Sequence, residues 1–322
     1  AEREMMFDEY VDRVGDIDAL TELAQWADVV TFEFENVPAL ALEAIEQHAV
    51  LRPSPRSLEV SQDRLAEKQL LESLGCPVAP YRAIDSLADL QSALGEFDTP
   101  AILKTRRLGY DGKGQVRISD AGAAGEAWEA VGGAASILEG VVAFEREVSV
   151  IVVRSHEGES LAYPPAENVH RDGILHTSSA PTGGVDTRQA TAIADALGHV
   201  GVLTVEFFDT GSELVVNEMA PRVHNSGHWT LDGAGCSQFE NHVRAVVGLP
   251  LGTCEPVTPT VMVNFVGGLP GSSEVLAVAG ASLHLYGKQA RPGRKLGHVN
   301  VVELGPAAIA LAERPSPNSA TN

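Results

Sequence analysis

The spacing of apolar and polar residues along the 322-residue chain predicts amphipathic helices mixed with short strands. Asn36 is expected to cap a helix that has Pro38 in its first turn. The predicted helices are 18–26, 37–48, 57–74, 189–199 and 238–247. Strands are predicted at 28–34, at 101–105 and repeatedly from residue 256 onward. This mixture of elements indicates an α/β (α+β) fold.

Apolar runs on both sides of the polar turn 209–212 predict a hairpin that carries two carboxylates. Glu206 interrupts the first strand, where an unpaired carboxylate is costly, and Glu218 ends the second. If Phe208 pairs with Glu213, the two carboxylates lie on opposite faces, whereas a longer connection or a β-bulge brings them together. Together they suit Mg²⁺, which takes oxygen ligands. The alternative is that Glu206 lies on a solvated face.

The loop 220–229, after the hairpin, is dense in groups that titrate or form hydrogen bonds. It contains Arg222, His224, Asn225 and His228, with proline and glycine among them. No helical or strand period explains this spacing, and such loops often carry binding or catalytic groups. The structural alternative is a hydrogen-bonded surface loop.

Glycines mark the tip of a second predicted hairpin, residues 109–114, between the strands 101–105 and 115–119. The tip lacks the Ser or Thr and the following helix of a Walker A loop. Its glycines still allow backbone N–H groups to approach a phosphate. Lys104 lies in a strand whose alternate residues are apolar, so its ammonium is expected to meet a phosphate rather than a carboxylate. A plain flexible hairpin is the alternative.

Cationic residues cluster near the C-terminus of a chain that is otherwise acidic. Arginine offers bidentate donors to a phosphate monoester and lysine a point charge, so this cluster could clamp such a group. A solvated basic turn is the alternative. The residues are Lys288, Arg291, Arg294 and Lys295.

Length, charge and cysteine content narrow the class of protein. The chain is long enough for two or three domains, and its net charge of −21 argues against nucleic acid as a partner. No apolar run approaches the length of a membrane span, and the N-terminal residues lack an apolar signal core. The widely spaced Cys76, Cys236 and Cys254 fit a reducing cytoplasm. Residues 315–322 are expected to form a disordered tail.

Four motifs in order resemble the ATP-grasp ligases, most closely the 5-(carboxyamino)imidazole ribonucleotide synthase branch. They are ILK…YDGKGQ, VEFF…VVNEM, PRVHNSGHW and YGK-x-x-RPGRK-x-GH. The resemblance implies an ATP-grasp fold with a partial N-terminal Rossmann-like (pre-ATP-grasp) domain, 1–55. It also implies an ATP-grasp domain, 56–250, with a lid at about 78–142, and a β-rich C-terminal domain, 251–314. The family's glycine-rich beginning is not found, so we expect a fragment or a diverged start.

The resemblance also implies roles for individual residues. Mg²⁺ or Mn²⁺ is expected on Glu206 and Glu218, and the chemistry on Arg222, His224, Asn225 and Asp111. The ribonucleotide set comprises Glu33, Tyr110, Asp111, Lys288, Arg291, Arg294 and Lys295. The ATP set comprises Arg64, Lys104, Gly109, Tyr110, Asp111, Gly112, Lys113, Gly114, Gln115, Glu139, Gly140, Val141, Val142, Glu147, His170, Asn217 and Glu218.

In such enzymes ATP phosphorylates bicarbonate, and the carboxyphosphate then carboxylates the amine of 5-aminoimidazole ribonucleotide in purine biosynthesis. By resemblance, Arg222 holds bicarbonate, His224 and Asn225 orient carboxyphosphate, and His224 or Asp111 handles the amine proton. The flap at 109–114 would exclude water. The expected partners are these small molecules, with no nucleic acid and no membrane, in a cytoplasmic homodimer. The alternatives are another ATP-grasp carboxylase or formyltransferase, or a truncated inactive nucleotide-binding fragment.

Overall fold

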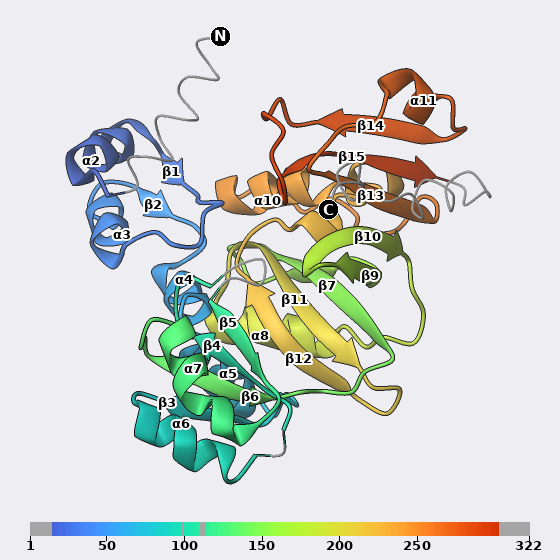
Figure 1. The fold of residues 1–322 in the computed structure, drawn as a ribbon. Helices are drawn as coiled ribbons and strands as arrows, with labels where there is room; N and C mark the ends of the chain where they lie inside the picture. Colours follow the sequence, from blue (N-terminus) through green and yellow to red (C-terminus); the bar gives the residue numbers. More distant parts are fainter. Residues whose placement is uncertain (1–14, 98, 110–113, 303–322) are drawn as a thin grey trace.

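The structure is a computed structural model that describes residues 15–97, 99–109 and 114–302. Predictions that concern Tyr110, Asp111, Gly112, Lys113 and the tail 315–322 therefore lie outside the described residues. The described residues form a small N-terminal unit, a four-stranded lid sheet and a large sheet whose far end is built by the C-terminal segment (Figure 1). No helix in this part of the chain has the length and apolar character needed to cross a membrane.

The N-terminal unit packs two helices against a short parallel strand pair (Figure 1). Ala24, Leu42 and Ile45 lie at the centre of its apolar core. The elements are α2 (Ile17–Trp26), β1 (Val29–Val30), α3 (Ala39–Glu46) and β2 (Val50–Leu51).

Two local predictions for this unit are wrong. The expected strand 28–34 is limited to β1, because the residues that follow contact distant parts of the chain instead of a neighbouring strand. Thr31 Oγ1 lies 2.8 Å from His242 Nε2, and the Glu35 carboxylate pairs with Arg222. Asn36 does not cap α3: Pro38 occupies the N-cap position, and no side chain makes a capping hydrogen bond there.

The helix predicted at 57–74 is two helices, α4 (Pro55–Ser61) and α5 (Arg64–Ser73). Asp63 separates them, because its carboxylate accepts hydrogen bonds from the backbone N–H groups of Leu65 and Ala66 and so caps α5. This break turns one face of α5 towards both sheets.

The lid sheet has the strand order β3-β6-β4-β5 among the described residues, and all of its pairs are antiparallel. The hairpin predicted around residues 109–114 is confirmed by the pairing of β4 with β5. Helices α6 and α7 cover the apolar face of the sheet (Figure 1). The elements are β3 (Tyr81–Ile84), α6 (Leu87–Leu94), β4 (Ala101–Thr105), β5 (Gln115–Ile118), η1 (Ala121–Ala123), α7 (Ala124–Ala130) and β6 (Ser136–Gly140).

The large sheet has nine strands within the described residues, in the order β12-β11-β7-β9-β10-β13-β15-β14, with β8 paired to β7. Alternate residues of β7 and β11 point to opposite faces, so α8 packs on one face and α10 on the other. The β-rich prediction from residue 256 onward is confirmed by β13, β14 and β15. The strands are β7 (Arg146–Arg154), β8 (Ser160–Ala162), β9 (Ala166–Arg171), β10 (Ile174–Ala180), β11 (Gly201–Asp209), β12 (Leu214–Ala220), β13 (Thr260–Val266), β14 (Ala281–Leu285) and β15 (Lys295–Val302). The helices are α8 (Arg188–Leu197), η2 (Asn225–Gly227), α9 (Thr230–Gly233), α10 (Gln238–Val247) and α11 (Ser272–Leu276).

Candidate active site

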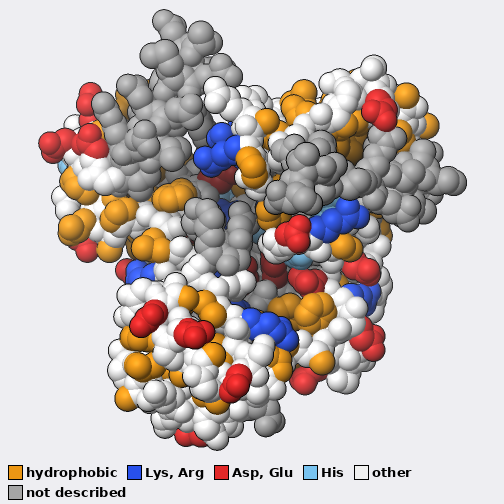
Figure 2. Space-filling view, viewed as in Figure 1, with side chains coloured by type: hydrophobic (Ala, Val, Ile, Leu, Met, Phe, Trp, Pro, Cys, Tyr) orange, Lys and Arg blue, Asp and Glu red, His pale blue; other side chains and the backbone are white. Residues whose placement is uncertain are grey.

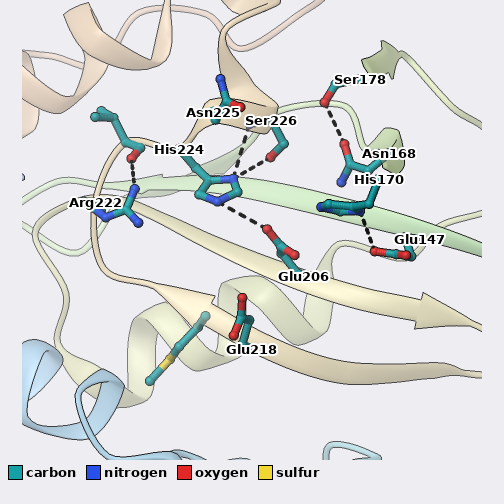
Figure 3. Close-up of polar contacts among 12 residues, drawn as sticks. Glu147, Asn168, His170, Ser178, Glu206, Glu218, Arg222, His224, Asn225 and Ser226 are labelled. Atoms are coloured by element: carbon teal, nitrogen blue, oxygen red, sulfur yellow. Dashed lines mark hydrogen bonds and ion pairs between the residues drawn. The ribbon is translucent and has the colours of Figure 1, made fainter. Parts of the chain in front are cut away.

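A β-bulge in the β11–β12 hairpin brings two carboxylates face to face. Phe207 pairs with Val216 and Glu206 pairs with Glu218, so Asn217 is the extra residue of the bulge. Glu206 and Glu218 therefore lie on the same side of the hairpin (Figure 3). The structure has the register that the metal interpretation needs.

Glu206 is not on a solvated face, since its side chain is only 16% exposed. Burial and the negative charge of Glu218 raise its pKa to about 7, although the charges of His170 and Lys295 oppose that rise. Glu218 is more open, with a side chain that is 52% exposed. The pair is thus a partly buried concentration of negative charge, and Figure 2 shows acidic side chains gathered in the central hollow of the molecule.

His224 closes one side of the carboxylate pair. Its Nδ1 accepts from the backbone N–H of Ser226 at 3.3 Å, which assigns the ring proton to Nε2, 3.2 Å from Glu206 Oε1. Burial, and then the charge of Arg222, hold the pKa of His224 well below its ordinary value. The imidazole is therefore neutral at pH 7 and held in one orientation.

Arg222 joins this site to the N-terminal unit. Its Nη2 lies 2.7 Å from Glu35 Oε1, and its Nη1 donates to the carbonyl of Val223 at 3.0 Å. Burial raises the pKa of Glu35 despite the opposing charge of Arg222. The acidic segment predicted to reach the ribonucleotide thus enters the site through Glu35, while the predicted Glu33 is exposed. Alternation along an extended chain puts both on one side, so the sequence carried no signal to separate them.

Two further predicted nucleotide residues lie beside the carboxylate pair. Glu147 on β7 and His170 on β9 form an ion pair with 2.8 Å between Oε2 and Nδ1 (Figure 3). Desolvation lowers the pKa of His170, but the hydrogen bond and charge of Glu147, with a contribution from Glu206, outweigh it and raise the pKa.

A second cluster, rich in cations, lies where α5 meets the lid sheet. Lys104 does not stand free for a phosphate as predicted: its Nζ lies 2.6 Å from Glu139 Oε2. The reason is strand pairing. Glu139 on β6 lies opposite Ile102 on β4, and Lys104 is two residues after Ile102, so the side chains of Glu139 and Lys104 lie on the same face of the sheet. Arg64 reaches Glu218 at 3.9 Å and the carbonyl of Gly109 at 3.4 Å.

The sequence did not single out Lys68, which belongs to the same cluster. Its Nζ lies 3.6 Å from Glu139 Oε1 and donates to the Asn217 carbonyl at 2.8 Å. The one available signal was a charged residue on the apolar side of α5, near Leu71.

The remaining predicted nucleotide-binding residues lie at or just beyond the ends of the lid strands. Gly114 needs to be glycine, because its φ is +70° and a Cβ there would lie 2.7 Å from Thr105 Oγ1. Gly109 lies near Arg64, Gln115 begins β5, and Gly140 ends β6, whereas Val141 and Val142 follow it. Val141 is exposed and Val142 half-buried.

Asn225, which is expected to orient carboxyphosphate together with His224, forms hydrogen bonds with Asn264. Its amide nitrogen donates to Asn264 Oδ1 at 3.0 Å, and its oxygen accepts from Asn264 Nδ2 at 2.6 Å. The same nitrogen lies 3.1 Å from His228 Nδ1. Figure 3 shows the side chain pointing away from Glu206. Asn225 therefore ties the loop to the C-terminal strand β13.

The basic turn connects β14 with β15 and lies at the edge of the site. The charge of Lys295 lowers the pKa values of Glu206, His170 and His224, so Lys295 is near these three groups. Arg294 is half-buried, Arg291 is exposed, and Lys288 Nζ stands 5.4 Å from the centre of the Tyr286 ring.

Family comparisons agree with this architecture. Residues 69–239 match the ATP-grasp domain, residues 5–62 the ribonucleotide synthetase preATP-grasp domain, and residues 260–310 the phosphoribosylaminoimidazole carboxylase C-terminal domain. The protein is an ATP-grasp protein with the predicted flanking domains.

Individual relatives specify the family further. The N5-carboxyaminoimidazole ribonucleotide synthase of Brucella melitensis is 49% identical over 296 residues, which cover 88% of this chain and 82% of the relative. That of Pseudomonas aeruginosa is 45% identical over 293 residues, covering 89% and 81%. This chain belongs to the N5-carboxyaminoimidazole ribonucleotide synthase family.

Solved structures show the same likeness. The crystal structure of the Thermus thermophilus synthetase superposes with a TM-score of 0.85 at 47% identity, covering 92% of this chain and 82% of that one. The Aspergillus clavatus synthase in complex with ADP and 5-aminoimidazole ribonucleotide gives a TM-score of 0.84 at 30% identity, covering 93% and 85%.

Proposed function

We propose that this protein uses ATP and bicarbonate to carboxylate 5-aminoimidazole ribonucleotide in purine biosynthesis, through carboxyphosphate, with release of ADP and phosphate. The observation that carries the proposal is the convergence of Glu206, Glu218, Arg222 and His224 at one bulged hairpin in a member of this family. Phosphoryl transfer asks mainly for positioning and charge neutralisation, which this arrangement supports.

The two opposed carboxylates fit a divalent cation. Burial and mutual repulsion raise the pKa of Glu206, and a cation would relieve both costs. Within the described residues no three His, Cys, Asp or Glu side chains form a metal-binding group. Mg²⁺, or Mn²⁺, would be held by Glu206 and Glu218 and would share its other positions with phosphate oxygens. When bound, the ion would neutralise charge on the transferring phosphoryl group.

Arg222 and His224 are the proposed contacts to bicarbonate and carboxyphosphate. Glu35 holds the Arg222 guanidinium in place, and the bond from Ser226 N–H fixes the ring of His224. Because Nε2 of His224 carries the ring proton, it could take the amine proton only after passing its own proton to Glu206, 3.2 Å away. Asp111, which lies outside the described residues, is the other candidate for that proton.

The basic turn is the proposed clamp for the ribonucleotide phosphate. Lys288, Arg291, Arg294 and Lys295 combine bidentate and point-charge donors, and the charge of Lys295 already extends to Glu206. Residues 109–114 would close over the nucleotide and exclude water, because carboxyphosphate is unstable to hydrolysis.

We further infer a cytoplasmic homodimer with domains at 1–55, 56–250 and 251–314, and a lid at about 78–142. The domain order is supported by the three matched domains. The homodimer and the cytoplasmic location are supported by the family resemblance. Light scattering coupled to size-exclusion chromatography would test the dimer, which predicts twice the chain mass of 34.0 kDa.

The decisive test measures ADP release with ATP and ¹³C-bicarbonate, with and without 5-aminoimidazole ribonucleotide, and follows the carboxylated product by NMR. We expect one product molecule for each ADP when all three substrates are present. ADP release that needs formate instead of bicarbonate would favour a formyltransferase, and no release under any condition would favour an inactive fragment.

A further inference from the structure

Lys68 is an almost fully buried lysine, with 1% of its surface exposed. A buried ammonium is costly unless it is paired and hydrogen-bonded. Among the described residues, its Nζ finds the carbonyls of Asn217 at 2.8 Å and Val216 at 3.4 Å, and Glu139 Oε1 at 3.6 Å. The two carbonyls accept hydrogen bonds from the ammonium, and Glu139 forms an ion pair with it. Lys68 thus joins the strand that carries Glu218 to the lid strand that carries Glu139.

Glu139 is shared between two lysines. Lys104 approaches Oε2 and Lys68 approaches Oε1, so each ammonium has its own oxygen. Burial raises the pKa of Glu139, but the charges of Lys104 and Lys68 outweigh burial and lower it. Burial raises the pKa of the neighbouring Glu67 to about 8, against the charge of Lys68 and the hydrogen bond from the Met219 N–H. Two ammonium groups therefore share the single carboxylate of Glu139, which leaves one positive charge in surplus around it.

This surplus has a consequence for nucleotide binding. If Glu139 had Lys104 as its sole partner, a phosphate that attracted Lys104 would leave a carboxylate buried and unpaired. With Lys68 in place, Glu139 remains paired when Lys104 turns away. We propose that Lys68 is a positioning residue that neutralises Glu139 and so leaves the charge of Lys104 available to the phosphates of the nucleotide. This inference rests on the proposed function, because it needs a nucleotide at Lys104.

Lys68 has a second possible role, since the carbonyl it meets at 2.8 Å belongs to the bulge residue Asn217. Loss of that contact could disturb Glu218 without any involvement of Glu139. A variant without the Glu139 charge separates the two roles. If Lys68 acts by neutralising Glu139, removing Lys68 from that variant should not weaken nucleotide binding further. If Lys68 acts through the bulge at Asn217, its removal should weaken binding in that variant as much as in the wild type.

The test is a double-mutant cycle on ADP affinity, measured by isothermal titration calorimetry on the full chain. Lys68→Met is expected to weaken ADP binding about tenfold or more and to raise the KM for ATP, with the KM for the ribonucleotide unchanged. The double variant K68M/E139Q is expected to bind ADP within about threefold of E139Q alone. Restored binding in the double variant is a result that general loss of structure would not produce.

Arg154→Met is the matched control, because it removes a partly buried ion pair to Asp195 (2.9 Å) that does not involve Glu139. It should leave ADP affinity unchanged. Unchanged ADP affinity in K68M would overturn the inference, and so would a double variant that binds ADP much more weakly than E139Q. If K68M does not fold, the ADP affinities of E139Q and K68M/E139Q still test whether Lys68 acts through Glu139.

The same measurements separate this inference from the proposed function. A wild-type protein that binds ADP but makes no carboxylated product would remove the proposed reaction and leave the role of Lys68 standing. A wild-type protein that does not bind ADP would remove the nucleotide site and the role of Lys68 with it.

Discussion

Glu206 and Glu139 are both buried glutamates on strands, yet their pKa values move in opposite directions. Their side chains are 16% and 6% exposed, and burial raises both pKa values. Repulsion from Glu218 adds to the effect at Glu206, whose pKa reaches about 7. At Glu139 the charges of Lys104 and Lys68 reverse it, and the pKa is lowered. Neighbouring charge, rather than burial, separates the two carboxylates.

The difference shows what each cluster still needs. Glu139 has cations of the chain beside it, so its cluster has charge to offer an anion. Glu206 faces Glu218, so its cluster is suited to a cation that comes with the substrate. A nucleotide bound with its metal at Glu206 and its phosphates towards Lys104 would satisfy both clusters at once. Lys68 connects them, because it meets both Glu139 and the bulge at Asn217.

Glu218→Gln should have the largest effect on this arrangement. The change keeps the size of the side chain and removes one of the two charges proposed to hold the metal, so turnover should fall roughly a thousandfold. Glu213→Gln is the control, since Glu213 is an exposed carboxylate of the same hairpin. Circular dichroism should be unchanged in both variants. Near-normal carboxylation by Glu218→Gln would mean that the carboxylate cluster has no part in metal binding.

Arg294→Ala should have a smaller and more selective effect. The proposal assigns the metal to the carboxylates and the sugar phosphate to the basic turn, so the KM for the ribonucleotide should rise roughly 10- to 100-fold. The KM for ATP should stay within about twofold. Arg188→Ala, which removes an exposed arginine paired with Asp186, is the control. Equal changes in the two KM values would contradict a separate phosphate clamp.

The elements around these clusters were predictable where the signal was local. The hairpin 101–118 followed from alternation and from glycines at its tip, and the family motifs identified the fold. Glu206 stood out because a carboxylate interrupts an apolar strand. The roles assigned to these residues stay predictions that the experiments above address.

Features that depend on distant contacts could not be predicted. The sequence left two hairpin registers open, and the observed bulge at Asn217 is held by Lys68, 149 residues away. The contact between Asn225 and Asn264, on a strand 39 residues later, had no signal in the loop sequence. The expected cap at Asn36 was wrong because α3 begins after Pro38, and the contacts of Thr31 with His242 and of Glu35 with Arg222 could not be predicted.

The affinity for a divalent cation should depend on pH through Glu206. Because its pKa is raised to about 7, a proton competes with the cation below pH 7, and affinity should fall about tenfold per pH unit there. Above pH 7 the affinity should level off. Mn²⁺ titrations followed by electron paramagnetic resonance between pH 5.5 and 8 would measure this. Glu206→Gln should show weak binding without that slope, and a flat wild-type profile would contradict the prediction.

The smallest expected effect is on stability, where the same isosteric change should act in opposite directions at the two sites. At pH 8 and without nucleotide or metal, Glu206→Gln should stabilise the fold by about 1–2 kcal/mol, because it removes a carboxylate whose charge is disfavoured. Glu139→Gln should destabilise it by about 1–3 kcal/mol, because the buried Lys68 and the half-buried Lys104 lose their counter-ion. Urea unfolding followed by circular dichroism would measure both.

The effects of the two substitutions on the free energy of unfolding should also depend differently on pH. The folded pKa of Glu206 lies above the ordinary value of 4.5, so its penalty is full above about pH 7 and absent below 4.5. The gain from Glu206→Gln should therefore shrink as the pH falls from 8 to 5. The folded pKa of Glu139 is lowered, so the stability that its charge contributes is present above pH 4.5 and is lost only in stronger acid. The cost of Glu139→Gln should persist at pH 5. If both variants shift the unfolding midpoint in the same direction at pH 8, neighbouring charge does not distinguish the two clusters, and the assignment of metal to one and phosphate to the other loses its physical basis.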